Sequence, residues 1–68
     1  MNITITVNGK AATVKENSRI SDFLALNNLS PDRVVVEYNF DIINKDSLGD
    51  TTLKENDTLE ILQIVGGG

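Results

Sequence analysis

The last strand-like segment of the chain, residues 58–65, most constrains the fold because it is apolar, or nearly so, on both faces. Leu59 and Ile61 fall on one face, and Leu62 and Ile64 fall on the other. A strand that is apolar on two faces is typical of the interior of a sheet. The sequence therefore predicts that this C-terminal strand lies in the middle of its sheet.

A β-hairpin is predicted at the other end of the chain. Isoleucine and valine alternate with threonine over residues 3–7, as in a half-buried strand. Asn8-Gly9 follows, and this dipeptide suits a two-residue type I′ turn because both positions need a positive φ. Residues 10–14 then return as the second strand of the hairpin.

A short helix follows the hairpin, because Ile20, Phe23 and Leu24 recur at helical spacing on one face. Either Ser18 or Arg19 could be the N-cap of this helix. Ser18 is the better candidate because its hydroxyl can accept a backbone hydrogen bond. Asn28 tolerates the left-handed conformation that ends a helix. We expect about two to three turns, stabilised mainly by packing.

The second half of the chain reads as strands joined by tight turns. Residues 33–38 predict a third strand, and Asn39-Phe40 predicts a turn, although Phe40 is a poor choice for a positive φ. Residues 41–43 are expected to form a short edge strand, and one helical turn is expected near residues 46–48. Leu53 is a predicted core anchor.

The predicted order is strand, strand, helix, strand, strand, strand. A hairpin followed by a helical crossover places a later strand beside the first one, in parallel. One helix across one face of a mixed five-stranded sheet makes an α+β domain of two layers. We assign this domain to residues 1–65, and residues 66–68 to a flexible glycine tail.

Composition excludes several classes of function. The 68 residues include no cysteine and no histidine, so thiolate chemistry and the commonest general base and metal ligand are missing. Ten acids against six bases give a formal charge of −4, which disfavours binding to nucleic acid. No apolar run is long enough to span a bilayer and Met1-Asn2 leads directly into a strand pattern, so we expect a cytoplasmic protein that binds no membrane.

The acidic residues do not form a recognisable catalytic or metal site. Asp41, Asp46, Asp50 and Asp57 lack the spacing of a calcium-binding loop, and we interpret them as solvated loop acids. No nucleophile is paired with a base. The sequence therefore predicts a protein that is not an enzyme, with no catalytic residue, no metal ligand and no bound cofactor.

The outer face of the last strand is a candidate docking surface. If Leu59 and Ile61 point to the helix, then Glu60, Leu62 and Ile64 point away from it, with Val35 beside them. Isolated surface apolar residues need no explanation, whereas clustered ones indicate a site for a partner protein. We therefore predict that Glu60, Leu62, Ile64 and Val35 bind a partner.

Three glycines, Gly66, Gly67 and Gly68, end the sequence. A frayed terminus is the simple interpretation. We favour a thin arm whose terminal carboxylate is the working group, because three extended glycines reach about 10 Å and carry no Cβ that would clash in a narrow channel.

The full-length pattern resembles the ThiS family, the sulfur carriers of thiamine biosynthesis within the ubiquitin-like β-grasp group. The resemblance is carried by the Asn-Gly hairpin, the short helix, the Val-rich strand into Glu37-Tyr38-Asn39, and the end Val65-Gly66-Gly67-Gly68. It implies a β-grasp sheet with strand order 2-1-5-3-4. This chain departs from the family pattern at Phe40, where the family often has Gly, and at Glu55-Asn56-Asp57, where it often has Asp-Gly-Asp.

The resemblance also implies a function. The Gly68 carboxylate would be adenylated by a separate E1-like activating enzyme of the ThiF type, which uses ATP, and then converted to a thiocarboxylate. A thiazole synthase of the ThiG type would receive the sulfur. The free carrier is expected to be a monomer.

Three alternatives remain open at this stage. A sulfur carrier for molybdopterin synthesis shares the fold and the Gly-Gly end but is usually somewhat longer. A ubiquitin-like modifier would be joined to lysines through Gly68. A plain β-grasp binding module would not need its terminal carboxylate at all. The sequence does not identify the sulfur donor or the stoichiometry of any partner complex.

Overall fold

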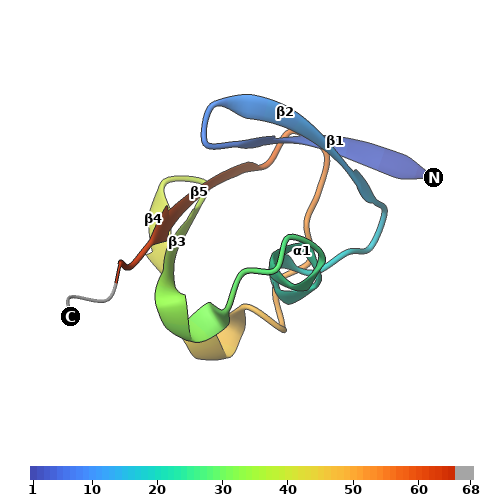
Figure 1. The fold of residues 1–68 in the computed structure, drawn as a ribbon. Coiled ribbons are helices and arrows are strands. Elements are labelled where there is room, and N and C mark those ends of the chain that lie inside the picture. The colour runs from blue at the N-terminus through green and yellow to red at the C-terminus, as the bar shows by residue number, and fades with distance from the viewer. Residues whose placement is uncertain (66–68) are drawn as a thin grey trace.

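A mixed sheet with one α-helix across one face makes up the computed structural model, which describes residues 1–65 (Figure 1). Within these residues the strands are β1 (Asn2–Val7), β2 (Lys10–Lys15), β3 (Val34–Tyr38), β4 (Asp41–Ile43) and β5 (Thr58–Gln63), and the helix is α1 (Ile20–Leu26). Two short 3-10 helices, η1 (Pro31–Arg33) and η2 (Lys45–Ser47), lie in the connections. The strand order is β2-β1-β5-β3-β4.

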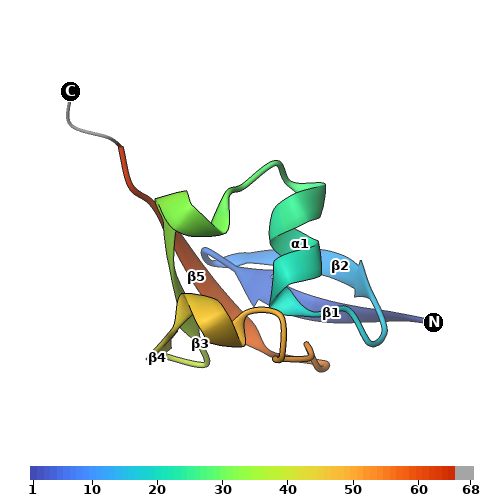
Figure 2. The same cartoon turned by 90° about the horizontal axis from the view of Figure 1, so that it is seen from below.

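β5 lies at the centre of the sheet, as its apolar faces predict. It pairs in parallel with β1 on one side and antiparallel with β3 on the other. Figure 2 shows the same arrangement from below, with α1 on one side of the sheet and next to the β1 and β2 hairpin. The predicted α+β architecture and the strand order 2-1-5-3-4 are therefore confirmed.

The β1–β2 hairpin is confirmed in register and in turn type. Val7 lies opposite Lys10, and Asn2 lies opposite Lys15. Asn8 has φ 49° and Gly9 has φ 83°, so both turn residues are left-handed. These are the two positive φ values that a type I′ turn requires.

The predicted N-cap of the helix was wrong by one residue. Arg19, not Ser18, is the N-cap of α1, and its backbone N–H donates to the Oδ2 of Asp22 over 2.9 Å. The reason is tertiary: the carbonyl of Ser18 accepts from the N–H of Leu53 over 2.8 Å, so residue 18 is held in extended pairing with a distant segment. A negative side chain in the first turn still favours the helix dipole, as expected.

The end of the helix follows the prediction. Asn28 adopts φ 57°, and the N–H of Leu29 returns to the carbonyl of Leu24 over 2.8 Å. The Leu29 side chain is half-buried against the core. The left-handed residue thus ends α1 and turns an apolar side chain back under it.

The turn between β3 and β4 is left-handed at both of its central residues. Asn39 has φ 50° and Phe40 has φ 75°, an uncommon conformation for a bulky residue. The side-chain Oδ1 of Asn39 accepts from the backbone N–H of Thr58, and the backbone N–H of Asn39 donates to the carbonyl of Thr58, each over 2.8 Å. Asn39 therefore anchors the turn to β5, while the Phe40 side chain is 77% exposed.

The core lies between α1 and the inner face of the sheet. The predicted anchor Leu53 is buried within it, and so are the inward residues of β5. The buried apolar residues are Ile5, Val14, Ile20, Leu24, Val34, Val36, Leu48, Leu53, Leu59 and Ile61. None of the helices within residues 1–65 is long and apolar enough to cross a membrane.

β5 is shorter than the sequence pattern predicts. It ends at Gln63 rather than at residue 65, because its antiparallel partner β3 begins only at Val34, which lies opposite Gln63. One further backbone bond, from the N–H of Ile64 to the carbonyl of Arg33 over 2.7 Å, continues past the strand. Ile64 is thus still bonded to the segment that precedes β3.

Candidate functional site

The two faces of β5 differ sharply in exposure. Leu59 and Ile61 point to the core and are buried. On the opposite side, Leu62 is 62% exposed and Ile64 is 53% exposed. The direction predicted for all four side chains is confirmed, because α1 covers only one face of the sheet.

The structure brings the predicted docking residues together. Val35 of β3 lies directly opposite Leu62 of β5 in the antiparallel ladder, and Val35 is half-buried. Ile42 of β4 lies opposite Glu37 and therefore on the same outer face, and it is exposed. Sequence reasoning missed Ile42, because only the register of β4 on β3 shows which face this side chain takes.

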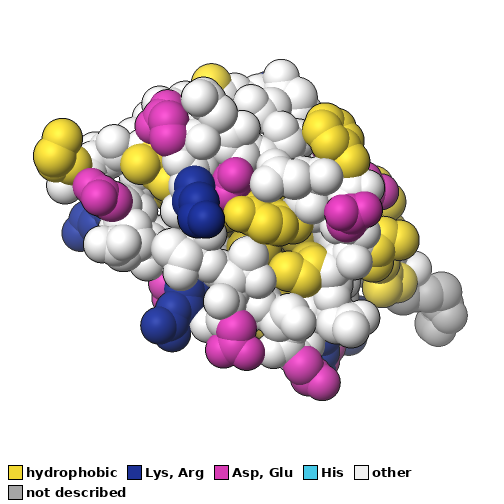
Figure 3. Space-filling model, turned by 180° about the vertical axis from the view of Figure 1, so that it is seen from behind, with side chains coloured by type: hydrophobic (Ala, Val, Ile, Leu, Met, Phe, Trp, Pro, Cys, Tyr) yellow, Lys and Arg dark blue, Asp and Glu magenta, His cyan; other side chains and the backbone are white. Residues whose placement is uncertain are grey.

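We call Val35, Ile42, Leu62 and Ile64 the outer patch. Figure 3 shows one face of the molecule, on which hydrophobic side chains gather on the side where the described chain ends. Most of the lysine and arginine side chains visible in that view lie on the other side. Val65, the last described residue, is also exposed.

Glu60, the fourth predicted docking residue, lies directly opposite Glu37 on the outer face. Like charges opposite one another on neighbouring strands destabilise a sheet. Within residues 1–65 the one ion pair is between Lys45 and Asp32. Neither Glu37 nor Glu60 is therefore paired with a basic side chain of these residues. Two half-buried carboxylates beside apolar side chains thus give the outer patch a negative centre.

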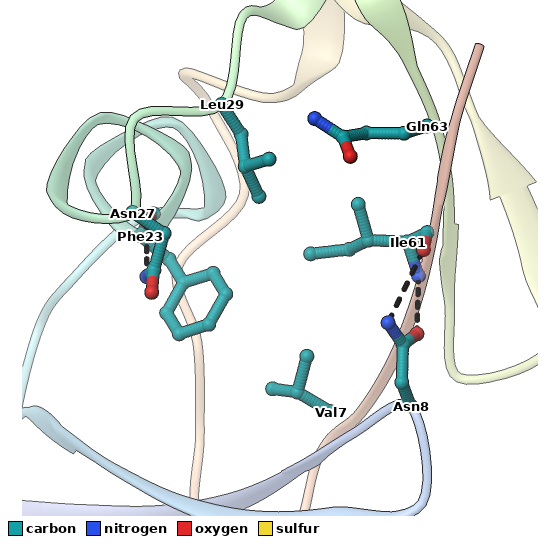
Figure 4. Close-up of a pocket in the computed structure, with 7 residues that line it drawn as sticks. All are labelled: Val7, Asn8, Phe23, Asn27, Leu29, Ile61 and Gln63. Atoms are coloured by element: carbon teal, nitrogen blue, oxygen red, sulfur yellow. Dashed lines mark hydrogen bonds between the residues drawn. The ribbon is translucent and has the colours of Figure 1, made fainter. Parts of the chain in front are cut away.

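Asn8 fixes the position of β5 from the hairpin turn (Figure 4). Its Oδ1 accepts from the N–H of Ile61 over 2.7 Å, and its Nδ2 donates to the carbonyl of Ile61 over 3.2 Å. The backbone N–H of Asn8 donates to the carbonyl of Leu59 over 2.9 Å. The side-chain amide therefore continues the short parallel ladder where β1 has already turned away.

A small cavity of about 210 Å³ opens next to this contact, between the end of α1 and β5. Apolar side chains and three amides line it, namely Val7, Asn8, Phe23, Asn27, Leu29, Ile61 and Gln63. It holds no acid, base or nucleophile, so the cavity offers packing rather than chemistry.

Asp57 organises the loop that leads into β5, and the prediction that it is a solvated acid was wrong. The residue is only 8% exposed. Its carboxylate accepts from the hydroxyl of Tyr38 over 2.7 Å, from the Nδ2 of Asn39 over 3.2 Å and from the N–H of Lys54 over 2.7 Å. Burial, followed by the hydrogen bond to Asp57 and its charge, raises the pKa of Tyr38 to about 12.

The described residues offer no metal centre. Over residues 1–65, no group of three or more acidic, cysteine or histidine side chains is arranged to hold an ion. The predicted working group, Gly68, and the arm formed with Gly66 and Gly67 lie outside the described residues.

Fold and site together define a class. The chain is a ubiquitin-like β-grasp protein whose central strand carries an exposed apolar patch and leads directly into its C-terminal residues. Residues 5–68 match the ThiS family. The chain belongs to the ThiS family, a family of sulfur carrier proteins.

Individual relatives agree over nearly the whole chain. It is 37% identical to the sulfur carrier protein ThiS of Bacillus subtilis (strain 168), over 94% of this chain and 98% of that protein. The crystal structure of the thiamine biosynthesis protein ThiS from Geobacter metallireducens superposes with a TM-score of 0.80 at 35% identity, covering 97% of this chain and 100% of that one. A solution structure of a thiamine biosynthesis protein from the same organism gives 0.79 at 32% identity, covering 97% and 88%.

Proposed function

We propose that this chain carries sulfur for thiamine biosynthesis on the carboxyl group of Gly68. The carboxylate attacks ATP in the active site of a separate E1-like, ThiF-type enzyme, which forms an acyl-adenylate and releases pyrophosphate. A sulfide-level donor then displaces AMP and leaves a thiocarboxylate. A ThiG-type thiazole synthase takes the sulfur from this group.

The observation that carries the proposal is the continuity between the outer patch and the terminal glycines. Leu62 and Ile64 are exposed on the strand that leads, within four residues of Ile64, to Gly68. An apolar surface next to a slender arm suits a protein that docks on an enzyme and inserts its terminus. Membership of the ThiS family supports the same chemistry.

The division of labour follows from reactivity. A carboxylate is a poor electrophile until it carries a good leaving group, and a thiocarboxylate is a good nucleophile. The carrier itself needs neither a cofactor nor a catalytic side chain, because the partner enzyme supplies the ATP site. The proposed division into a domain, residues 1–65, and a flexible arm, residues 66–68, serves this role in a cytoplasmic monomer.

The test is to move or remove the terminal carboxylate. One variant lacks Gly68, and a second carries one additional residue after it. Both are expected to abolish thiocarboxylate formation, because a misplacement of about 1 Å in an active site costs roughly a hundredfold in rate. Intact mass after incubation with ATP, a ThiF-type enzyme and a sulfur source measures the exchange of one oxygen for sulfur.

Thermal melting provides the control for both variants. The melting temperature is expected to stay that of the parent protein, because the core lies within residues 5–61. Gly67→Val keeps the carboxylate but adds a branched Cβ and restricts φ. Its sulfur loading is therefore expected to fall between that of the parent protein and the complete loss in the truncated and extended variants. If the parent protein gains no thiocarboxylate under these conditions, the chain is a binding module rather than a sulfur carrier. Loading of the extended protein at the parent rate would mean that the position of the terminal carboxylate does not matter.

A further inference from the structure

A groove runs along the opposite edge of the molecule, between β2 and α1. Its volume is about 530 Å³. It is lined by Asn2, Ala12, Thr13, Val14, Lys15, Ser18, Phe23, Leu26 and Asn27. Leu26 lies on the helical side of the groove and is 79% exposed. Among residues 1–65, Leu26 and Met1 are the two large apolar residues that are highly exposed outside the β3–β5 half of the sheet. The floor, formed by Val14 and Phe23, is partly or wholly buried.

The strand beside this groove has an open edge. β2 is the last strand of the sheet on its side, with β1 as its neighbour. In an antiparallel pair joined by a two-residue turn, the flanking residues Val7 and Lys10 form a hydrogen-bonded pair, and bonded pairs then recur at every second residue. The hydrogen bond from the N–H of Glu16 to the carbonyl of Met1 agrees with this alternation, in which residues 10, 12, 14 and 16 bond to β1 or to the residue before it. The backbone N–H and C=O groups of Ala11 and Thr13 therefore point outward.

Charge is distributed unevenly around the sheet. Residues 10–19 carry three bases and one acid, whereas residues 32–60 carry eight acids and three bases. Lys10 and Lys15 stand at the two ends of β2, and Lys15 also lines the groove. The open edge thus has a positive charge at each end in a protein that is acidic as a whole.

We propose that the β2 edge and this groove form a second docking surface, which binds an extended acidic segment of a partner protein as an additional strand. Its backbone would pair with Ala11 and Thr13. Every second side chain of the segment would point into the groove between Val14, Phe23 and Leu26, so these side chains should be apolar. Acidic residues at its two ends would lie beside Lys10 and Lys15.

The same lysines select against a second copy of this chain. Two β2 edges paired with each other would bring four lysines, Lys10 and Lys15 of each copy, onto one short ladder. Lysines on an edge strand discourage such self-pairing. The geometry therefore favours a heterologous acidic partner.

This surface is separate from the outer patch. The outer patch lies on β5 and on its neighbours β3 and β4, whereas β2 lies beyond β1 on the other side of β5, and the groove opens on the face that α1 covers. A partner on the β2 edge would leave the C-terminal segment accessible. The proposal goes beyond sulfur carrying and does not depend on it.

The test uses a fluorescent probe peptide in which valines alternate with threonines and two glutamates stand at each end. Titration with the full-length protein is expected to give saturable binding. Amide hydrogen exchange should slow at Ala11 and Thr13 in the complex, while Ala12 and Val14, already bonded to β1, should change little. A peptide with lysines in place of the glutamates is expected to bind at least about tenfold more weakly.

Three single variants provide the matched comparison. Leu26→Asp and Lys15→Glu should each weaken binding by about tenfold or more, since the first removes an exposed apolar wall and the second reverses a flanking charge. Leu62→Asp makes the same chemical change as Leu26→Asp on the outer patch, and it should leave peptide binding intact. Leu26→Asp should in turn leave sulfur loading unchanged.

Several results would overturn the proposal. They are a failure of the probe to bind the parent protein, unchanged exchange at Ala11 and Thr13 in the complex, and equal losses for Leu26→Asp and Leu62→Asp. A protein with one residue added after Gly68 is expected to bind the probe normally, so a failed sulfur-carrier hypothesis would be recognised independently of this surface.

Discussion

At the scale of single residues, Asn8 combines two roles that are usually separate. Its backbone takes the left-handed conformation of a type I′ turn, and its side-chain amide makes two hydrogen bonds to the backbone of Ile61. The turn alone would accept glycine equally well. Asparagine therefore matters here for its side chain, which holds the second half of β5 against the hairpin.

Asn8→Gly is expected to lower the free energy of unfolding by about 1–2 kcal/mol, because two hydrogen bonds in a partly buried site are lost while the turn is preserved. Urea denaturation measures this value. Asn28→Gly is the matched control, because Asn28 also has a positive φ, at 57°, and ends α1 through its backbone conformation. Equal effects at the two sites would mean that the Asn8 amide contributes nothing beyond backbone conformation.

Tyr38 gives the molecule a distinct response to alkaline pH. Its hydroxyl donates to the buried Asp57, and its pKa is raised to about 12, first by burial and then by this bond and charge. The unfolded chain titrates at about 10. Because the folded value is the higher one, the stabilising effect is complete below about pH 10 and is lost as the pH rises through about 12.

We therefore expect the difference in unfolding free energy between the parent protein and Tyr38→Phe to shrink as the pH rises from about 10 to about 12. Since the chain has one tyrosine, tyrosinate absorbance reports this group alone. Native protein should titrate near pH 12, and urea-unfolded protein about two units lower. Equal midpoints in the two states would show that Asp57 does not hold the hydroxyl proton.

At the scale of elements, β5 combines a buried core face and an exposed apolar face in six residues. Leu59 and Ile61 fill the core, whereas Leu62 lies on the outer patch opposite Val35. Burial of the outer patch is gained only when a partner covers it. Substitutions on the two faces should therefore separate stability from sulfur loading.

Leu62→Glu is expected to change stability by less than about 0.5 kcal/mol, because the side chain is mostly exposed. The same substitution should raise the KM for the carrier in adenylation by placing a charge in the docking surface. Ile61→Ala should instead cost about 2–5 kcal/mol in stability by opening a cavity. Steady-state adenylation and urea denaturation measure the two effects, and a Leu62→Glu protein that unfolds as readily as Ile61→Ala would contradict this assignment of faces.

Elements encoded by local patterns were predictable from the sequence, and those set by distant contacts were not. Alternation and Asn8-Gly9 were sufficient for the hairpin, and the two apolar faces of residues 58–65 were sufficient to place β5 centrally. The helix start was missed because Leu53 pairs with Ser18. The end of β5 was missed because it depends on where β3 begins.

The residues of the candidate site were likewise predictable where a local pattern encodes them and not where distant contacts place them. Val35, Glu60, Leu62 and Ile64 follow from strand period, so their common face could be predicted. Ile42 joins them only through the register of β4 on β3, which a three-residue strand does not reveal in isolation. Asp57 looked like a loop acid because its three hydrogen-bond donors come from two separate parts of the chain.

At the scale of the whole molecule, charge divides the sheet into two unlike sides. The β2 side is locally basic, while the segment from residue 32 to residue 60 carries most of the acids. Opposite potentials on two surfaces of one small protein steer different partners to different edges. The outer patch, with Glu37 facing Glu60, should therefore meet a basic surface on the proposed activating enzyme.

Association with that enzyme is accordingly expected to slow as salt concentration rises, because steering between opposite charges is screened over about 8–10 Å at physiological salt. The double variant Glu37→Gln/Glu60→Gln should bind more slowly and with a weaker salt dependence. Its fold should be more stable by about 0.2–1 kcal/mol, since a like-charge pair on neighbouring strands is removed. Stopped-flow association rates across a salt series, together with urea denaturation, measure the two opposite effects.

Asp46→Asn/Asp50→Asn is the matched control, because it removes the same net charge from the loop between β4 and β5, away from the sheet. If the overall negative charge of residues 32–60 alone guided association, both double variants would reduce the salt dependence of the association rate equally. We expect a smaller change in the control, because the Glu37 and Glu60 carboxylates lie beside the outer patch, where the proposed partner would contact them. Equal salt dependences in the two variants would place the docking surface elsewhere on the molecule.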